Sequence, residues 1–266
     1  PVLGLPQEKP LFSINQYPVK LLEEFMTDSR AIIVVKKDEE NKFEIRENQY
    51  ASPQYVFHIS GKTGTDIIGC LEKNAPKMIQ LIKEMEIAES QRINSLSLRN
   101  QKVIENKFHI SLEIPSTYDY VLHKSNLLWL KKEVNGGSTS LLIYQVPIDY
   151  LKNDSNLVSK IIRMRDSVGN LYISGTEPKT TMITEEAYAP YFSKISLDGK
   201  EAYETKGTWE LKNDFMGGPF INYAIVDEQY SRILVLEGFC YAPSKDKRDL
   251  MHELESIIRS VKIVKR

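Results

Sequence analysis

Residues 203–212 show the clearest β-strand pattern of the chain. Tyr203, Trp209 and Leu211 alternate with charged residues, so an extended backbone would place the two kinds on opposite sides. The charged residues of the segment are Glu204, Lys206, Glu210 and Lys212. A turn pair, Asp198-Gly199, precedes them. We therefore expect a strand with one packed face and one charged face in contact with solvent.

Other segments supply the neighbours of this strand in an antiparallel sheet. The run from Ile233 to Tyr241 is apolar on both sides, which is typical of a central strand. We expect 203–212, 220–226 and 232–241 to pair with one another. Further strands are expected on either side of the hairpin signal Asn135–Ser138.

Two amphipathic helices accompany these strands. Leu157, Val158, Ile161 and Ile162 recur at helical spacing after Ser155, a suitable N-cap. A last helix, with Ser244 as its expected cap, is marked by an apolar stripe made of Leu250, Leu254, Ile257, Ile258 and Val261. The predicted fold class is α+β, with a C-terminal antiparallel sheet that helices cover on at least one side.

An N-terminal lobe is expected over residues 1–107, and the sheet lobe over 108–266. The apolar β-branched run Ile32–Val35 predicts a buried strand. A long helix is expected from Ile67 onward, with Pro76 interrupting or re-capping it. The polar stretch 89–107 is interpreted as the exposed end of that helix, a spacer between the lobes.

Charge and cysteine content exclude several classes of protein. Lys and Arg total 35 and Asp and Glu total 36, a net charge of -1, so no field over the whole molecule favours nucleic acid. No apolar run is long enough to span a membrane. The two cysteines, Cys70 and Cys240, form no zinc motif, and we expect no metal and no cofactor. We also expect the two to be unbonded, because they belong to different lobes.

No catalytic residue is predicted. The four histidines lie in no recognised motif, and the sequence has neither a nucleophile elbow nor a phosphate-binding loop. Glu237 is the one notable acid, because in a strand it shares a face with Ile233, Val235 and Phe239. Either it pairs with a Lys or Arg or lies at the rim of the sheet, or it is a functional acid; we favour the first interpretation.

The best candidate surface is the loop Asn213–Phe220. Its members could cradle an apolar ligand or partner, or could fold back and cap the end of the sheet. We favour the second interpretation, with Phe215 and Phe220 buried near Trp209 and with glycines chosen for their backbone angles. The candidate binding residues are Trp209, Phe215, Met216, Gly217, Gly218, Phe220 and Tyr223.

Three runs resemble an uncharacterised family, the domain of unknown function 4837 of Bacteroidetes envelope lipoproteins: Gly4–Gln7 with Phe12, Tyr50–Gln54 and Asp214–Phe220. The resemblance spans nearly the whole chain. It implies a signal peptide and a lipidated cysteine upstream of Pro1, and hence a lipid-anchored place in the cell envelope, facing the periplasm or the exterior. It carries over no catalytic residue. The element order of the second lobe is also similar to PsbP-like α/β sandwiches, by fold analogy alone.

Three functions remain open at this point. The first is a non-enzymatic envelope module that binds a partner protein or a small ligand. The second is a hydrolase or transferase whose acidic residues converge only in the folded chain, and the third is a purely structural lipoprotein domain. Membrane contact is expected only through the lipid anchor, and no nucleic-acid partner is expected.

Overall fold

The computed structural model describes residues 2–5, 9–151 and 156–264. The chain forms two compact units. The large unit contains Pro1–Leu11 and Ile93–Arg266, and the small unit contains Phe12–Arg92. The division therefore falls earlier in the chain than the expected boundary at residue 107, and the first residues join the C-terminal unit.

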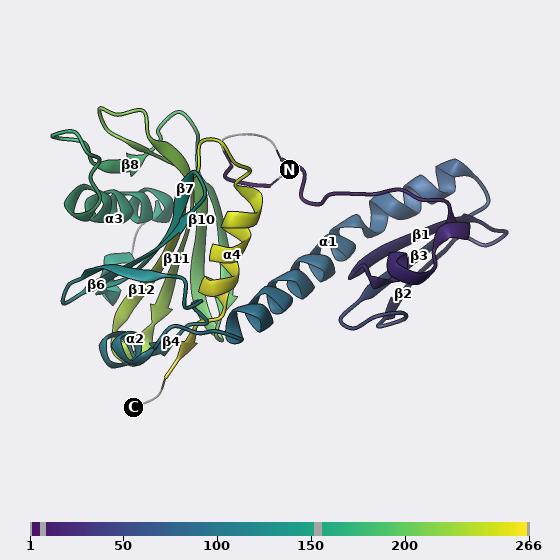
Figure 1. Ribbon diagram of the computed structural model, residues 1–266, viewed down its shortest axis with the longest axis horizontal. Helices are drawn as coiled ribbons and strands as arrows, with labels where there is room; N and C mark the ends of the chain where they lie inside the picture. The colour runs from purple at the N-terminus through teal and green to yellow at the C-terminus, as the bar shows by residue number, and fades with distance from the viewer. Residues whose placement is uncertain (1, 6–8, 152–155, 265–266) are drawn as a thin grey trace. The chain divides into compact units, whose positions relative to one another are not determined.

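A curled antiparallel sheet organises the large unit (Figure 1). Its strands occur in the order β5-β6-β7-β12-β11-β10-β8, and β9 also pairs with β10. The strands are β5 (Asp119–His123), β6 (Leu127–Val134), β7 (Gly137–Pro147), β8 (Met182–Thr184), β9 (Tyr191–Leu197), β10 (Lys200–Leu211), β11 (Gly217–Asp227) and β12 (Arg232–Tyr241). The predicted pairing of β10, β11 and β12 is confirmed.

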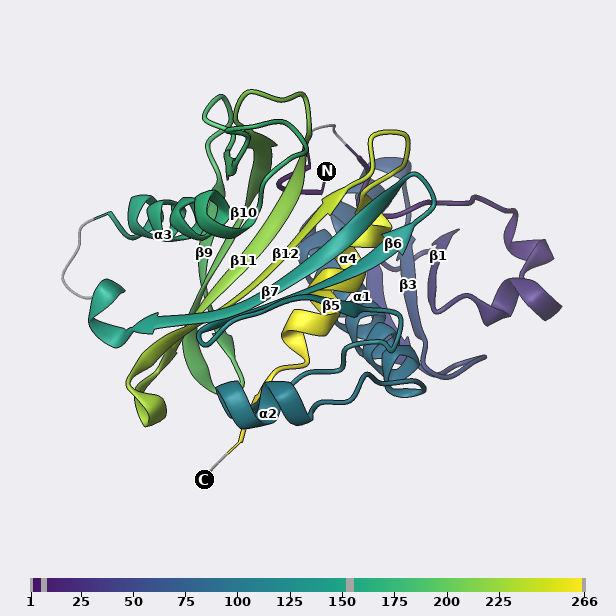
Figure 2. The same cartoon turned by 60° about the vertical axis from the view of Figure 1, so that its left-hand side comes forward.

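Helices cover both faces of this sheet (Figures 1 and 2). α3 (Leu157–Tyr172) packs on one face, where its Ile161 and Met164 join a cluster with Trp209 and Phe239. On the other face, α4 (Arg248–Arg259) and α2 (Lys102–Phe108) pack into a second cluster. The fold is therefore mixed α+β, as predicted from the sequence.

Short elements complete the large unit. They are the two-residue strands β4 (Ile110–Ser111) and β13 (Lys262–Ile263), which pair with each other, and the 3-10 turns η3 (Ile148–Leu151) and η4 (Glu228–Tyr230). The stretch interpreted as a spacer is not one continuous helix, because α1 ends at Ser95 and α2 starts at Lys102. Ile104 and Phe108 of α2 are fully buried, so this segment belongs to the core.

The starts of the helices differ from those expected. α4 starts at Arg248, after Lys247 as N-cap, so Ser244 is not its cap. Asn156 caps α3 by accepting a hydrogen bond from the Ser159 amide. Ser155, like part of Gly4–Gln7, lies outside the described residues.

Glu204 and Lys206, on the charged face of β10, are covered rather than solvated, whereas Lys212 just beyond the end of the strand is exposed. Lys206 Nζ lies 3.3 Å from Glu255 of α4, and Glu204 accepts a 2.6 Å hydrogen bond from the Tyr223 hydroxyl. The polar ends of these side chains are satisfied beneath the helix, so alternation correctly predicted the strand but not the exposure of its second face.

The small unit consists of a three-stranded sheet and most of one long helix. Strand order is β1-β3-β2, with β1 parallel and β2 antiparallel to β3. Its elements are η1 (Val19–Leu21), η2 (Glu24–Asp28), β1 (Ala31–Lys37), β2 (Lys42–Glu47), β3 (Tyr55–Gly61) and α1 (Gly64–Ser95). α1 continues through Pro76 without a break, and its Met78 and Ile82 pack on Phe57 and Ile59 of β3.

β1 is an edge strand, which corrects the expectation of a fully buried one. Ile32 is buried, but Ile33 and Val35 are exposed. The apolar run predicts a buried strand because both of its faces are apolar, but among the residues that the structure describes β1 pairs on one side only.

Candidate functional site

The β10–β11 hairpin contains most of the predicted site residues. Leu211 donates its amide to Met216 O at 2.8 Å and closes the turn. Asn213 adopts a left-handed φ of 64°, and the Asp214 carboxylate accepts the Phe215 amide at 2.6 Å. Asn213 Nδ2 also donates to Lys179 O at 3.4 Å. These bonds give the loop a defined conformation.

Phe215 lies at the tip of this hairpin and is fully exposed to solvent. The expectation that it is buried is therefore wrong. Its neighbour Met216 is half-buried against the cluster under α3, and Phe220 is 1% exposed. Since the turn closes between Leu211 and Met216, Phe215 is left outside the sheet, whereas Phe220 is well inside β11.

The predicted site residues do not converge on one surface. Trp209 and Phe220 face α3, whereas Tyr223 faces α4 and is fully buried there. The Trp209 ring lies edge-on to Phe239 at 5.6 Å, and Arg165 lies 3.8 Å over the Phe220 ring. These aromatic residues form core contacts on two sides of the sheet.

Gly217 and Gly218 serve close packing rather than unusual backbone angles, because neither has a positive φ. Trp209 pairs with Gly218, and its indole Nε1 donates to Cys240 O on β12 at 3.2 Å. A Cβ atom on Gly218 would lie 2.1 Å from that same carbonyl oxygen. Gly218 thus leaves the space in which the indole reaches across β11.

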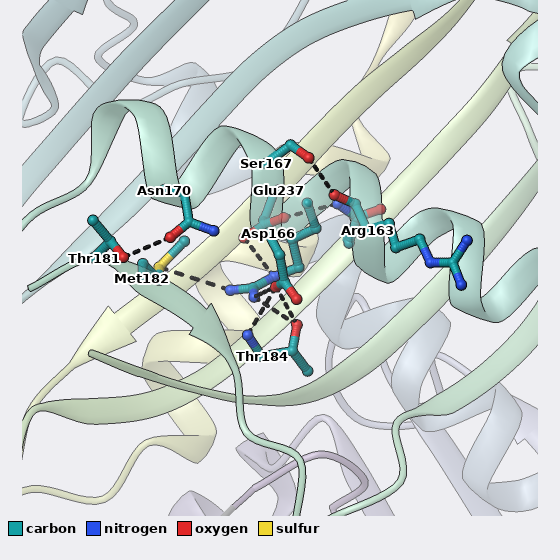
Figure 3. A network of polar contacts seen from close by, with 10 residues as sticks. Arg163, Asp166, Ser167, Asn170, Thr181, Met182, Thr184 and Glu237 are labelled. Atoms are coloured by element: carbon teal, nitrogen blue, oxygen red, sulfur yellow. Dashed lines mark hydrogen bonds and ion pairs between the residues drawn. The ribbon is translucent and has the colours of Figure 1, made fainter. Parts of the chain in front are cut away.

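Glu237 is the centre of a buried polar network between α3 and the sheet (Figure 3). Its Oε1 lies 3.0 Å from Arg165 Nε in an ion pair that lacks hydrogen-bond geometry, and its Oε2 accepts from Asn222 Nδ2 at 2.8 Å. Both members of the ion pair are buried, with Glu237 0% and Arg165 1% exposed. Glu237 is paired with an arginine, as the first interpretation required, but it lies in the interior and not at a rim.

Asp166 and Thr184 extend the network from α3 to β8 (Figure 3). Asp166 Oδ1 accepts from the Thr184 amide at 2.8 Å and from its hydroxyl at 2.7 Å. Arg165 Nη1 donates to Thr184 Oγ1 at 2.9 Å. The contacts fix α3 and β8 to the sheet through side chains that no sequence motif marked. The available signal was the position of Arg165, four residues after Ile161 on the apolar stripe of α3.

Burial raises the pKa of the Glu237 carboxyl, and the nearby Arg165 guanidinium acts in the opposite direction. A general acid or base must reach the proton that it transfers. Glu237 has no solvent-exposed surface, so its environment fits a structural ion pair better than an acid that meets substrate.

Metal-binding clusters and membrane-spanning helices do not occur among the residues that the structure describes. These residues hold no group of His, Cys, Asp and Glu that could bind a metal ion. Cys70 and Cys240 are both free, as predicted, and burial raises the pKa of the Cys240 thiol to about 12. None of the described helices combines the length and apolar character needed to cross a bilayer.

A shallow pocket of about 270 Å³ opens in the large unit. Its lining residues are Leu98, Arg99, Asn100, Val103, Ser116 and Tyr120. Arg99 is engaged by Asp119 at 2.7 Å, whereas the buried hydroxyl of Tyr120 has no hydrogen-bond partner among the described residues. The volume is below the roughly 300–1,000 Å³ usual for small-molecule sites.

Comparisons with known proteins match this chain to two family models and to solved structures. Residues 97–260 match a family described as "Domain of unknown function (DUF4837)", and residues 1–95 match "Domain of unknown function (DUF8532)". The resemblance proposed for nearly the whole chain is therefore divided between two families. No curated protein matches the chain. The Saccharomyces cerevisiae Ran-binding protein Mog1p is similar at 7% identity and a TM-score of 0.37, over 59% of this chain and 90% of that one.

Proposed function

The chain belongs to the family of the domain of unknown function 4837, and we propose that it is a non-enzymatic module that binds a partner protein. We place this module in the cell envelope of a bacterium of the Bacteroidetes, held there by a lipid anchor upstream of Pro1. The contact with the partner is made by Phe215 at the tip of the β10–β11 hairpin. The observation that carries the proposal is the full exposure of this phenylalanine on an ordered turn.

An exposed phenylalanine costs free energy in water, since its ring would be more favourably placed in an apolar environment. Aromatic anchors presented on a rigid element are typical of binding hot spots, because little conformational entropy is lost when they bind. The hydrogen bonds of Asn213 and Asp214 give Phe215 that rigid support. A partner protein is favoured over a small ligand because Phe215 projects from the tip of a hairpin, whereas small-molecule sites are concave.

Site-specific photocrosslinking tests the proposal. A benzophenone amino acid replaces Phe215 in the full-length protein in its own cells, and crosslinked proteins are identified by mass spectrometry. Tyr188, which is also exposed, provides the matched control position. We expect a discrete adduct from position 215 and none from position 188.

Direct binding to the crosslinked protein then decides the matter. Phe215→Ser should weaken binding at least about tenfold, roughly 1.4 kcal/mol, whereas Phe215→Tyr should retain most of the affinity. Both variants should melt like the wild type, because the side chain contacts no core. Equal affinities for wild type and Phe215→Ser would refute the proposed contact.

A further inference from the structure

β1 of the small unit leaves one edge of its sheet unpaired. Among the described residues it pairs only with β3, and it contains the sequence Ala-Ile-Ile-Val-Val-Lys-Lys. Ile33 and Val35 are 44% and 38% exposed. A regular, seven-residue edge strand with exposed β-branched side chains is a template for pairing with another strand.

Hydrogen bonds to β3 show which backbone groups face the free edge. The Tyr55 amide donates to Arg30 O, and the Asp38 amide donates to Gly61 O. Since N–H and C=O directions alternate along a strand, the even-numbered residues of β1 point toward β3. Ala31, Ile33, Val35 and Lys37 therefore point their backbone groups outward.

The sequence of β1 is self-complementary in one antiparallel register. A two-fold axis through Val34 sets Ile33 opposite Val35 of a second copy, and Ala31 opposite Lys37. These are all outward-pointing residues, so each such pair can exchange two backbone hydrogen bonds. Val34 then meets Val34 as a non-hydrogen-bonded pair, and no two lysines face each other.

Charges at the ends of the strand fit the same register. Arg30 lies opposite Asp38 of the second copy, so unlike charges meet at both ends of the contact. Within one chain, Arg30 contacts Glu86 at 2.6 Å and Asp38 contacts Lys36 at 2.8 Å, and both side chains retain 42% exposure. Like charges placed opposite each other would disfavour pairing, and this register avoids them.

The packing on the helix side of the sheet is consistent with this pairing. Ile33 and Val35 pair with Phe57 and Ile59 of β3, which lie in the core beneath α1. Antiparallel joining of two β1 strands would cover each exposed Ile33 with Val35 of the other copy. The apolar layer of each three-stranded sheet would thus continue into its partner.

We propose that two copies of this protein associate through β1 about a two-fold axis at Val34, forming a continuous six-stranded sheet. The contact involves one short strand from each copy and falls among small interfaces, so we expect a dissociation constant in the micromolar range. The association uses the small unit and is independent of the partner contact proposed for Phe215.

A disulfide across the axis provides the sharpest test. In the full chain with Cys70→Ser, Val34→Cys should form a disulfide-linked dimer under mild oxidation, because non-hydrogen-bonded pairs place Cα atoms about 4.5 Å apart. Lys36→Cys is the matched control: its side chain is more exposed, but the two copies of residue 36 would be about 13 Å apart. Crosslinking at position 36 with none at 34 would overturn the proposed register.

Sedimentation equilibrium measures the association without crosslinking. Wild type at about 1–300 µM should shift from the monomer mass toward twice that mass, within the affinity range expected of a weak interface. Val35→Lys should weaken association at least about tenfold, whereas Val121→Lys, on an exposed strand of the large unit, should leave it unchanged. A wild type that stays monomeric throughout, or a dimer insensitive to Val35→Lys, would rule out the proposal.

Discussion

Glu237 shows how a single buried charge is accommodated in the sheet. An isolated carboxylate in an apolar interior costs several kcal/mol, and a paired one is tolerated when its lone pairs are satisfied. Arg165 supplies the opposite charge and Asn222 supplies a hydrogen bond. The strand pattern around Glu237 indicated that a partner was needed. It could not indicate Arg165, because the contact depends on how α3 lies across β12.

Glu237→Gln should alter the pH dependence of stability. Burial raises the folded-state pKa of Glu237 above its ordinary 4.5, so the folded chain holds this proton more tightly than the unfolded chain. The contribution of this group to the free energy of unfolding is greatest below about pH 4.5, and it is lost as pH rises through the raised pKa. The difference in free energy of unfolding between the variant and wild type should therefore shift in favour of the variant as pH rises from 4 to 8, by about 1.4 kcal/mol per unit of pKa shift.

Denaturant melts followed by tryptophan fluorescence measure this difference. Glu201→Gln is a suitable control, because hydrogen bonds from Lys194 and Tyr203 lower the pKa of Glu201. The stability from Glu201 is lost as pH falls, so its variant should show the opposite slope. A pH-independent difference for Glu237→Gln would contradict the raised pKa.

Phe215 in the turn and Phe220 in β11 are the same residue type and lie close in sequence, yet they differ completely in burial. Phe220→Ala should lower the free energy of unfolding by about 3–5 kcal/mol, because it removes a buried ring that packs against Arg165. Phe215→Ala, the matched control, should leave it unchanged. Urea melts give both values, and a wild-type midpoint for Phe220→Ala would show that the site can lose this ring without cost.

The β10–β11 hairpin shows what a local pattern specifies at the scale of an element. Alternation of apolar and charged residues predicted β10, and Gly217 and Gly218 predicted unusual backbone angles in the loop that follows it. The turn itself lies at 212–216, upstream of Gly217 and Gly218, and it depends on Asn213 in the left-handed region. Glycine composition alone could not reveal that Gly218 makes room for the Trp209 indole, since that need arises only when three strands are paired.

Gly218→Ala should therefore destabilise the large unit by about 3 kcal/mol, at the upper end of the range for overpacking. The added Cβ would meet the Cys240 carbonyl, which belongs to the β12 backbone and cannot move without disturbing the pairing of β11 and β12. Gly69→Ala is the control, because nothing lies within 4 Å of its added Cβ in α1. It should stabilise its helix by about 0.5–1 kcal/mol. Thermal melts by circular dichroism would compare them, and an unchanged Gly218→Ala would disprove the packing role.

The exposure of side chains was less predictable than the type of element to which they belong. An apolar run such as Ile32–Val35 predicts a strand but not how many neighbours it has. Charged residues such as Glu204 and Lys206 predict an exposed face, but in the folded chain the helix α4 lies over them. Strand identity follows from local alternation, whereas exposure depends on contacts between segments far apart in the chain.

The whole molecule combines two units with very different cores. The small unit has a small core, in which the buried side chains of Phe57, Ile59, Met78 and Ile82 pack together. The large unit has an extensive cluster on each face of its sheet. Since stability rises with buried apolar area, we expect the small unit to be the less stable of the two.

The chain should therefore unfold in two steps, the small unit first. Both tryptophans of the sequence, Trp129 and Trp209, lie in the large unit, so their fluorescence reports only that unit. Most of α1 lies in the small unit, whereas α2, α3 and α4 lie in the large unit, so helical circular dichroism at 222 nm reports on both units. We expect the dichroism to fall in two steps, the first of them at a lower urea concentration than the change in fluorescence. Hydrogen exchange should likewise be fastest in Phe12–Arg92, because local opening follows local stability. Coincident transitions, together with uniform protection across β3 and β12, would mean that the two units unfold as one cooperative body.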